Sequence, residues 1–176
     1  QLESWMWDDV NFLWIGYLDS GNDVESYGAE IELDFMLTDS LQLFTNLGWL
    51  ETEVDEITVY DLDSSSFVNR SNREQAKSPS YQFNVGGRYQ FTASLSGRFS
   101  VEGRDESYYG YYHDEKLDSY TLLHASLNWQ HGDFDVQLWG RNLTDHDYSV
   151  HGLYFANDPR KGWVNESYNQ LGEPRT

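Results

Sequence analysis

Cysteine is absent from the 176 residues, so the sequence excludes disulfides, thiolate chemistry and thiolate metal sites. Basic residues are scarce as well, since 11 Lys and Arg stand against 30 Asp and Glu, a formal net charge of −19. That balance argues against nucleic acid or an anionic membrane surface as a partner. No apolar run approaches the roughly 20 residues of a membrane helix. No secretory signal opens the sequence and no Pro/Gly/Ser-rich linker divides it, so we expect a single domain over residues 1–176.

Aromatic residues are abundant, at 16% of the sequence, and many of them alternate with polar residues. Every odd position from Tyr81 to Phe91 is apolar or glycine, and the even positions are mostly amides or arginine. The same alternation resumes from Leu95 to Gly103. Side chains of a strand point to alternate faces, so this pattern predicts two antiparallel strands and a tight turn. Their length exceeds the roughly 5–6 residues of soluble strands and approaches the roughly 9–11 of tilted membrane strands.

Comparable alternation predicts four further strands, over residues 27–37, 41–49, 121–129 and 134–140. A less regular apolar segment, Trp5 to Leu18, is expected to be the first strand, and residues 169–176 the beginning of an eighth. Three stretches are expected to be loops: residues 55–79, which are polar and read as irregular, the tyrosine-rich residues 108–117, and residues 145–168. Short turns therefore alternate with longer loops along the chain, which is typical of outer-membrane barrels and has no counterpart in soluble sandwiches.

Turn lengths also predict how strands pair. A three-residue turn over 92–94 would place Arg88 directly opposite Arg98, which is unfavourable unless an acid intervenes. A two-residue X-Gly turn would place Trp129 opposite Phe134. Since an arginine turned toward lipid would cost roughly 2–4 kcal/mol near the bilayer midplane, the polar faces of a membrane barrel must look inward.

Several short motifs resemble TonB-dependent outer-membrane receptors, and they occur in that family's order. They are residues 139–145 (WGRNLTD) followed by Tyr148, 170–176 (QLGEPRT), 27–30 (YGAE), 43–48 (LFTNLG) and 78–81 (SPSY). The matching residues of the two C-terminal motifs are Arg141, Asn142, Leu143, Asp145, Tyr148, Gly172, Pro174 and Arg175. The resemblance implies an all-β fold: an antiparallel transmembrane β-barrel segment of about seven or eight long meander strands, from the C-terminal part of a barrel of about 22 strands.

The same resemblance implies a location and partners. The family's barrels lie in the bacterial outer membrane, are plugged by an N-terminal domain, and import scarce nutrients with energy coupled from the inner membrane. Expected partners are therefore the lipid bilayer, the plug, the inner-membrane energy-coupling protein and a small-molecule or metal-chelate cargo. Residues 1–176 would be an incomplete barrel, without plug or earlier strands. The expected function is energy-coupled uptake of a ferric siderophore or a similar nutrient.

Candidate ligand contacts are aromatic and basic residues of the loops and polar faces: Tyr108, Tyr109, Tyr111, Tyr112, Trp163 and Arg104. Rigid amphipathic rings make good ligand contacts, but these rings would equally suit an aromatic girdle at the membrane interface. Arg104 could attract anionic chelates or pair with acids of the wall or plug. No nucleophile–base–acid set, phosphate-binding glycine loop or zinc spacing is present, so we expect no enzyme, no cofactor and no metal site.

Two alternatives stay open at this point. One is a complete small eight-stranded outer-membrane barrel that acts as an adhesin or structural protein. The other is a soluble ligand-binding barrel of the lipocalin kind. The surroundings of the apolar faces distinguish these alternatives. In a soluble barrel the apolar faces must be covered by a protein core, whereas in either membrane barrel they must contact hydrocarbon.

Overall fold

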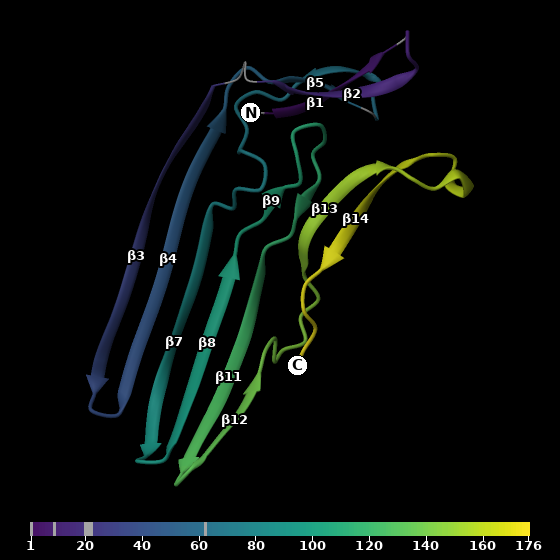
Figure 1. The fold of residues 1–176 in the computed structure, drawn as a ribbon. Coiled ribbons are helices and arrows are strands. Elements are labelled where there is room, and N and C mark those ends of the chain that lie inside the picture. The colour runs from purple at the N-terminus through teal and green to yellow at the C-terminus, as the bar shows by residue number, and fades with distance from the viewer. Residues whose placement is uncertain (1, 9, 20–22, 62) are drawn as a thin grey trace.

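The computed structural model describes residues 2–8, 10–19, 23–61 and 63–176 (Figure 1). Its centre is a six-stranded antiparallel sheet in the order β12-β11-β8-β7-β4-β3. These strands are β3 (Val24–Thr38), β4 (Leu41–Val54), β7 (Tyr81–Thr92), β8 (Leu95–Arg104), β11 (Tyr120–His131) and β12 (Phe134–Gly140). Each pairs with the next of these strands along the chain, and within the described residues the edge strands β3 and β12 do not pair with each other. The predicted all-β antiparallel meander is confirmed, as a sheet that is not closed.

The strands are long, as the alternation predicted, and β3 and β4 extend beyond the predicted ranges 27–37 and 41–49. β3 and β4 span 15 and 14 residues, β7 and β11 span 12 each, and β8 spans 10. Tight turns join β3 to β4, β7 to β8 and β11 to β12 at one end of the sheet, and the long connections gather at the other (Figure 1). The predicted sorting of short turns and long loops is therefore confirmed.

The first two tight turns share the sequence Thr-x-Ser-Leu, and a threonine side chain organises each. Thr92 Oγ1 accepts hydrogen bonds from the backbone N–H groups of Ser94 (3.3 Å) and Leu95 (3.1 Å). Thr38 makes the equivalent pair of bonds in the other turn. Beside each turn the register shifts by one residue, which keeps the outward and inward faces in phase on both strands.

The predicted register of the β7–β8 hairpin is confirmed. Tyr89 lies opposite Gly97, and Arg88 lies directly opposite Arg98. The Arg98 guanidinium lies over the ring of Phe44, 4.1 Å from its centroid, and a cation–π contact of this kind is favourable. An aromatic ring of β4 thus has the stabilising role that we expected of an acid.

The predicted register of the β11–β12 hairpin is wrong. Trp129 lies opposite Val136 and not Phe134, because the two turn residues are Gly132 and Asp133. Gly132 has a φ of 57°, which a glycine adopts without strain and which the first central position of these hairpin turns requires. The shift moves each partner by two positions, so every side chain keeps the face that the alternation predicted.

Segments expected to be a single strand or irregular loops contain four short hairpins. They are β1 (Leu2–Asp8) with β2 (Leu13–Asp19), β5 (Thr58–Asp61) with β6 (Ser66–Asn69), β9 (Ser107–Tyr108) with β10 (Lys116–Leu117), and β13 (Ser149–Ala156) with β14 (Asn165–Leu171). A 3-10 helix, η1 (Pro159–Lys161), lies between β13 and β14. The predictions of one strand from Trp5 to Leu18 and of an irregular loop over residues 55–79 are wrong, and the other two predicted loops also contain strands.

The predicted eighth strand over residues 169–176 is also wrong, because β14 begins earlier and ends at Leu171. The terminal Thr176 nevertheless lies beside the main sheet. Its N–H donates to the Arg141 carbonyl (3.2 Å), and the Arg141 N–H donates to its carbonyl (3.1 Å). One antiparallel bond pair therefore extends the pairing beyond the end of β12.

The apolar face of the main sheet is exposed. At mid-height Ile31, Phe99 and Leu127 keep 51%, 50% and 46% of their surface accessible. Buried apolar side chains lie in or beside the long connections (Val54, Ile57, Val59, Tyr109 and Leu117) or on the opposite face (Leu122). Exposed aromatic residues lie at both ends of the apolar face, as in interfacial girdles: Tyr27, Trp49, Tyr81, Phe91, Trp129 and Phe134. A soluble sheet needs a core under its apolar face, and the described residues provide none there.

No helix among the described residues is both long enough and apolar enough to cross a membrane.

Candidate functional site

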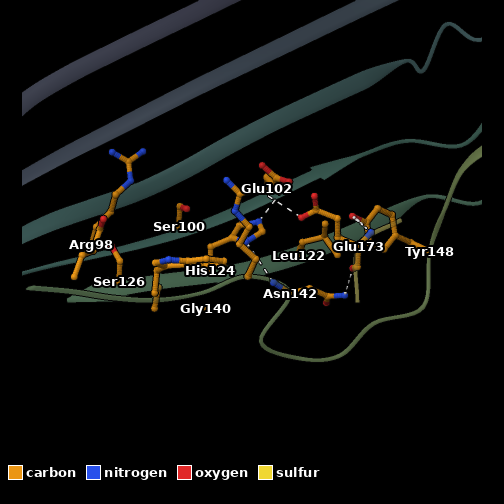
Figure 2. A pocket seen from close by; sticks show the side chains of 14 residues that line it. Arg98, Ser100, Glu102, Leu122, His124, Ser126, Gly140, Asn142, Tyr148 and Glu173 are labelled. Carbon is orange, nitrogen blue, oxygen red and sulfur yellow. Dashed lines mark hydrogen bonds and ion pairs between the residues drawn. The ribbon is translucent and has the colours of Figure 1, made fainter. Parts of the chain in front are cut away.

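The two C-terminal motifs meet at the end of β12, where Asn142 is 98% buried (Figure 2). Its side-chain amide donates to the carbonyls of His146 (2.9 Å) and Glu173 (3.2 Å), and its Oδ1 accepts from the His146 N–H (2.9 Å). Its φ is 48°, a left-handed conformation that asparagine adopts more readily than most residues. Asn142 therefore joins the turn after β12 to the segment after β14.

Close packing completes this junction. A Cβ on Gly172 would lie 2.0 Å from the Tyr148 ring, so any side chain there would displace that ring. One on Gly140 would lie 2.6 Å from a Leu143 methyl, so the Leu143 side chain would have to move. The Tyr148 carbonyl accepts from the Gly172 N–H at 2.8 Å. An exposed ion pair between Arg175 and Asp145 (3.4 Å) and another between Arg141 and Glu173 (3.5 Å) border the junction. The structure thus brings the predicted motif residues together as a structural junction.

The junction lines one side of a hollow of about 560 Å³ on the polar face of the sheet (Figure 2). His124 Nε2 lies 3.4 Å from Glu102 Oε1, and His124 Nδ1 accepts from the Asn142 N–H at 3.4 Å. Arg98 and Arg141 also line the hollow. The inward face can therefore present both cationic and anionic groups to whatever enters it.

The long connections pack into one unit, which we call the loop cap and define as residues 55–80, 105–119 and 145–171. Its first two segments share a small apolar core in which Ile57 and Val59 are buried together with Val54, the last residue of β4. Tyr111 and Tyr112 pack against this core. Burial raises the pKa of Tyr111, so its ring stays neutral at physiological pH.

Ion pairs join the same two segments. Arg70 pairs with Asp61 at 2.9 Å and also with Asp114, and Arg73 pairs with Asp114 at 3.2 Å. Arg73 also donates to the His113 carbonyl (3.2 Å). Hydrogen bonds from Ser64 and then the Arg70 guanidinium lower the pKa of Asp61, which keeps this buried carboxylate ionised. Pairing of this kind offsets the cost of burying the guanidinium groups.

The β13–β14 hairpin is held by the other two segments. Tyr109 donates its hydroxyl hydrogen to Asn169 Oδ1 at 2.6 Å. Tyr154 donates to Asp63 Oδ2 at 2.8 Å, and this hydrogen bond to a carboxylate raises the pKa of Tyr154 to about 12. Asn165 donates to the other oxygen of Asp63 at 2.8 Å. All three segments of the loop cap are thereby connected to one another.

The structure does not bring the predicted ligand contacts into one site. Tyr109, Tyr111 and Tyr112 are engaged in packing of the loop cap. The ring of Tyr108 lies against two cations, Arg73 at 3.8 Å and Lys116 at 4.2 Å from its centroid. Trp163, beside the 3-10 helix, keeps 62% of its surface exposed, and Arg104 lies at the end of β8 below the loop cap. Ligand contact by these residues stays a prediction.

Sequence reasoning missed the residues that assemble the loop cap. Arg70 and Asp114 lie 44 positions apart, and Asn165 and Asp63 lie 102 apart. Neither pair belongs to a local motif, and no periodic pattern marks them. The one local signal was the density of tyrosine in residues 108–112, which identified an unusual segment and left its role open.

Comparison with known proteins separates the alternatives. A family model described as "TonB dependent receptor-like, beta-barrel" matches residues 8–143, more than half of the chain. The chain belongs to the TonB-dependent receptor family. That assignment, together with an open sheet, argues against a complete eight-stranded barrel and against a soluble lipocalin-like one.

Two solved receptor structures show the same fold. The siderophore receptor PiuA from Acinetobacter baumannii matches 88% of this chain with a TM-score of 0.68 and 16% identity. The ferric-catecholate import receptor Fiu from E. coli K12 matches 97% with a TM-score of 0.60 and 18% identity. This chain covers 21% and 22% of those receptors, so it spans about a fifth of their length.

Family membership fixes the setting of the sheet. TonB-dependent receptors are non-enzymatic transporters of the bacterial outer membrane, so the exposed apolar face is the lipid-facing wall of such a barrel. The polar face with its hollows is then the lumen face, and the loop cap lies at one rim. Among the described residues the two edges of the main sheet, β3 and β12, are open, and a closed barrel would have to cover them.

Proposed function

We propose that the chain forms the C-terminal part of the wall and rim of a receptor that takes up a ferric siderophore or a chemically similar scarce nutrient. The observation that carries this proposal is the combination of a polar lumen face with a packed loop cap at one rim. Both solved receptors that share the fold are named for siderophore or ferric-catecholate transport. The names of these two receptors support the cargo class as a proposal for this chain.

The proposal assigns wall and rim roles and no reaction chemistry. Cargo would approach past the loop cap, where Trp163 is exposed and two cations, Arg73 and Lys116, lie against the Tyr108 ring. Energy for transport would come from the inner-membrane coupling protein through the plug, which are partners of the intact receptor. Aromatic and cationic groups suit flat, anionic chelates, because rings stack and cations attract charge.

A growth experiment tests the cargo class. A strain that lacks the receptor is grown with a panel of iron chelates and vitamins as sole sources, with an empty vector or with the full-length gene. We expect growth to be restored on one or a few ferric chelates. Uptake of labelled chelate should be lost when the energy-coupling protein is deleted. Restoration on none of the iron chelates, with the receptor present in the outer membrane, would contradict the proposal.

A further inference from the structure

The guanidinium of Arg104, at the boundary between the lumen face and the loop cap, has hydrogen-bond donors without an acceptor. Its Nε and Nη2 atoms are enclosed by protein and have no hydrogen-bond partner. These two nitrogens form the edge of the guanidinium that grips a carboxylate or phosphate through two parallel hydrogen bonds. Buried donors are nearly always paired in folded proteins, and each exception needs an explanation.

The neighbours of Arg104 do not supply that partner. It lies between Gln82 and Tyr120 on the adjacent strands, with its guanidinium carbon 5.1 Å from the Tyr120 ring centroid. Within the described residues Arg104 forms no ion pair, and Glu102, the acid two positions earlier on the same face, lies beside His124 instead. The ring contact stabilises the charge and leaves the N–H groups unused.

A small cavity of about 70 Å³ adjoins Arg104 on the side of the loop cap. Its lining includes the second cationic residue Lys77, the buried Ser107, and His151 from β13, and no carboxylate lines it. The Lys77 backbone is fixed by a hydrogen bond to the Tyr108 carbonyl at 2.9 Å. A cavity of this size holds a single carboxylate or an oxyanion of similar size, and both cationic side chains favour negative charge there.

We propose that Arg104 and Lys77 form an oxyanion-binding site beneath the loop cap, which takes a carboxylate or a similarly sized oxyanion. Because Nε and Nη2 are enclosed in this structure, the guanidinium rotates on binding to present these donors to an anion in the cavity, and Lys77 adds a second positive charge. An occupied site would join β8 of the wall to β13 of the loop cap. Two sources share this chemistry: a free anion, and a carboxylate from the part of the receptor outside this chain.

The site is tested in the full-length receptor, without any transport assay, so it stands or fails separately from the proposed cargo. Thermal unfolding is followed at constant ionic strength while chloride is replaced by acetate or by phosphate. A free anion predicts a saturable rise of roughly 2–4 °C that Arg104→Gln abolishes and Arg104→Lys mostly removes. Arg98→Gln is the matched control, because Arg98 has the same charge on the same strand and face and must keep the response.

The second source has its own readout. A structure of the full-length receptor should then show a carboxylate oxygen within hydrogen-bond distance of Arg104 Nε or Nη2, and added anions should have no effect on the unfolding temperature. The site is refuted if anions have no effect and no carboxylate lies there. A response that survives Arg104→Gln would refute it equally.

Discussion

The hydroxyl of Tyr109 lies 2.6 Å from Oδ1 of Asn169, which ties the β9–β10 connection to the last hairpin across 60 positions of sequence. The Tyr109 ring lies against Gly152 of β13, where a Cβ would approach a ring carbon to 2.3 Å. A tyrosine that sequence alone offered as a ligand contact or girdle residue is therefore a buried link within the loop cap. The rim of this receptor is a packed structure with its own core.

The contact between Tyr109 and Gly152 gives the first prediction. Gly152→Ala should loosen the β13–β14 hairpin at a cost of about 1–3 kcal/mol, because the added methyl overlaps the ring. Amide hydrogen exchange of residues 149–171 in the full-length receptor measures this. Gly110→Ala is the control, since a Cβ there meets its nearest neighbour at 3.7 Å. Equal protection in both variants would contradict the account of the loop cap.

Asn142 gives the second prediction, which concerns the junction formed by the family motifs. Asn142→Ala should lower the free energy of unfolding by about 3 kcal/mol, because it removes three buried hydrogen bonds and places alanine at a positive φ. Asn142→Gly should cost about 1 kcal/mol less, since glycine tolerates that φ. Heat-modified electrophoretic mobility of the full-length receptor measures both. Identical losses would show that backbone strain has no part.

The third prediction concerns pH and His113. Burial lowers the pKa of His113, the nearby Arg70 and Arg73 act in the same direction, and Asp114 and Glu115 act against them. Its ring lies 5.7 Å from the Tyr109 ring and 5.0 Å from the Tyr154 ring, and its Nδ1 accepts from the Glu115 N–H at 3.3 Å. Protonation would remove that acceptor and add a cation beside two arginines.

The direction of the pH effect depends on whether the closed or the opened loop cap binds a proton on His113 more readily. An opened loop cap would expose His113 with an ordinary pKa of about 6.5, above its value in the closed form. Closure is therefore favoured fully above about pH 6.5 and is weakened as the pH falls below it. Exchange protection of residues 107–117, corrected for intrinsic rates, should drop from pH 7 to pH 5. His113→Gln should remove this drop, and His131→Gln, in a distant turn, should not.

The fourth prediction concerns the two faces of the sheet. Phe99→Arg should destabilise the receptor in the membrane by about 2–4 kcal/mol, because the side chain of residue 99 lies at mid-height on the face assigned to lipid. Gln137→Arg should be tolerated, because Gln137 lines the hollow on the opposite face. The amount of heat-modifiable full-length receptor in the outer membrane measures both. Equal tolerance of the two arginines would argue against a lipid-facing Phe99.

The sequence predicted those parts of the fold in which one face is apolar and the other polar. Period-two alternation identified the six long strands, and turn length set the register where Arg88 meets Arg98. The β11–β12 turn was misplaced because a glycine with positive φ fits either central position of a two-residue turn, and the register of the folded hairpin places Gly132 first. In β13 the alternation fails because Gly152 and Tyr154 pack into the loop cap on one face while Leu153 and Phe155 are apolar on the other, so neither face reads as polar.

The candidate site was predictable only where its residues belong to a local sequence motif. Motif residues such as Asn142 and Gly172 were visible because a family shares them locally. The loop cap was not, because its ion pairs and hydrogen bonds join residues that are distant in sequence and of ordinary composition. Arg104 stood out only as one of several arginines on the polar face, and the unpartnered state of its donors is a property of the folded chain.

The most direct test compares adjacent positions of β11. Single cysteines are placed at Leu127 and at Asn128 in a full-length receptor without other reactive cysteine, labelled with a fluorophore and reconstituted in bilayers. Nitroxide-bearing lipids should quench the label at position 127 strongly and the label at position 128 little, because the two side chains point to opposite faces. Quenching of both labels alike, or of neither, would contradict a wall with lipid on one face and a water-filled lumen on the other.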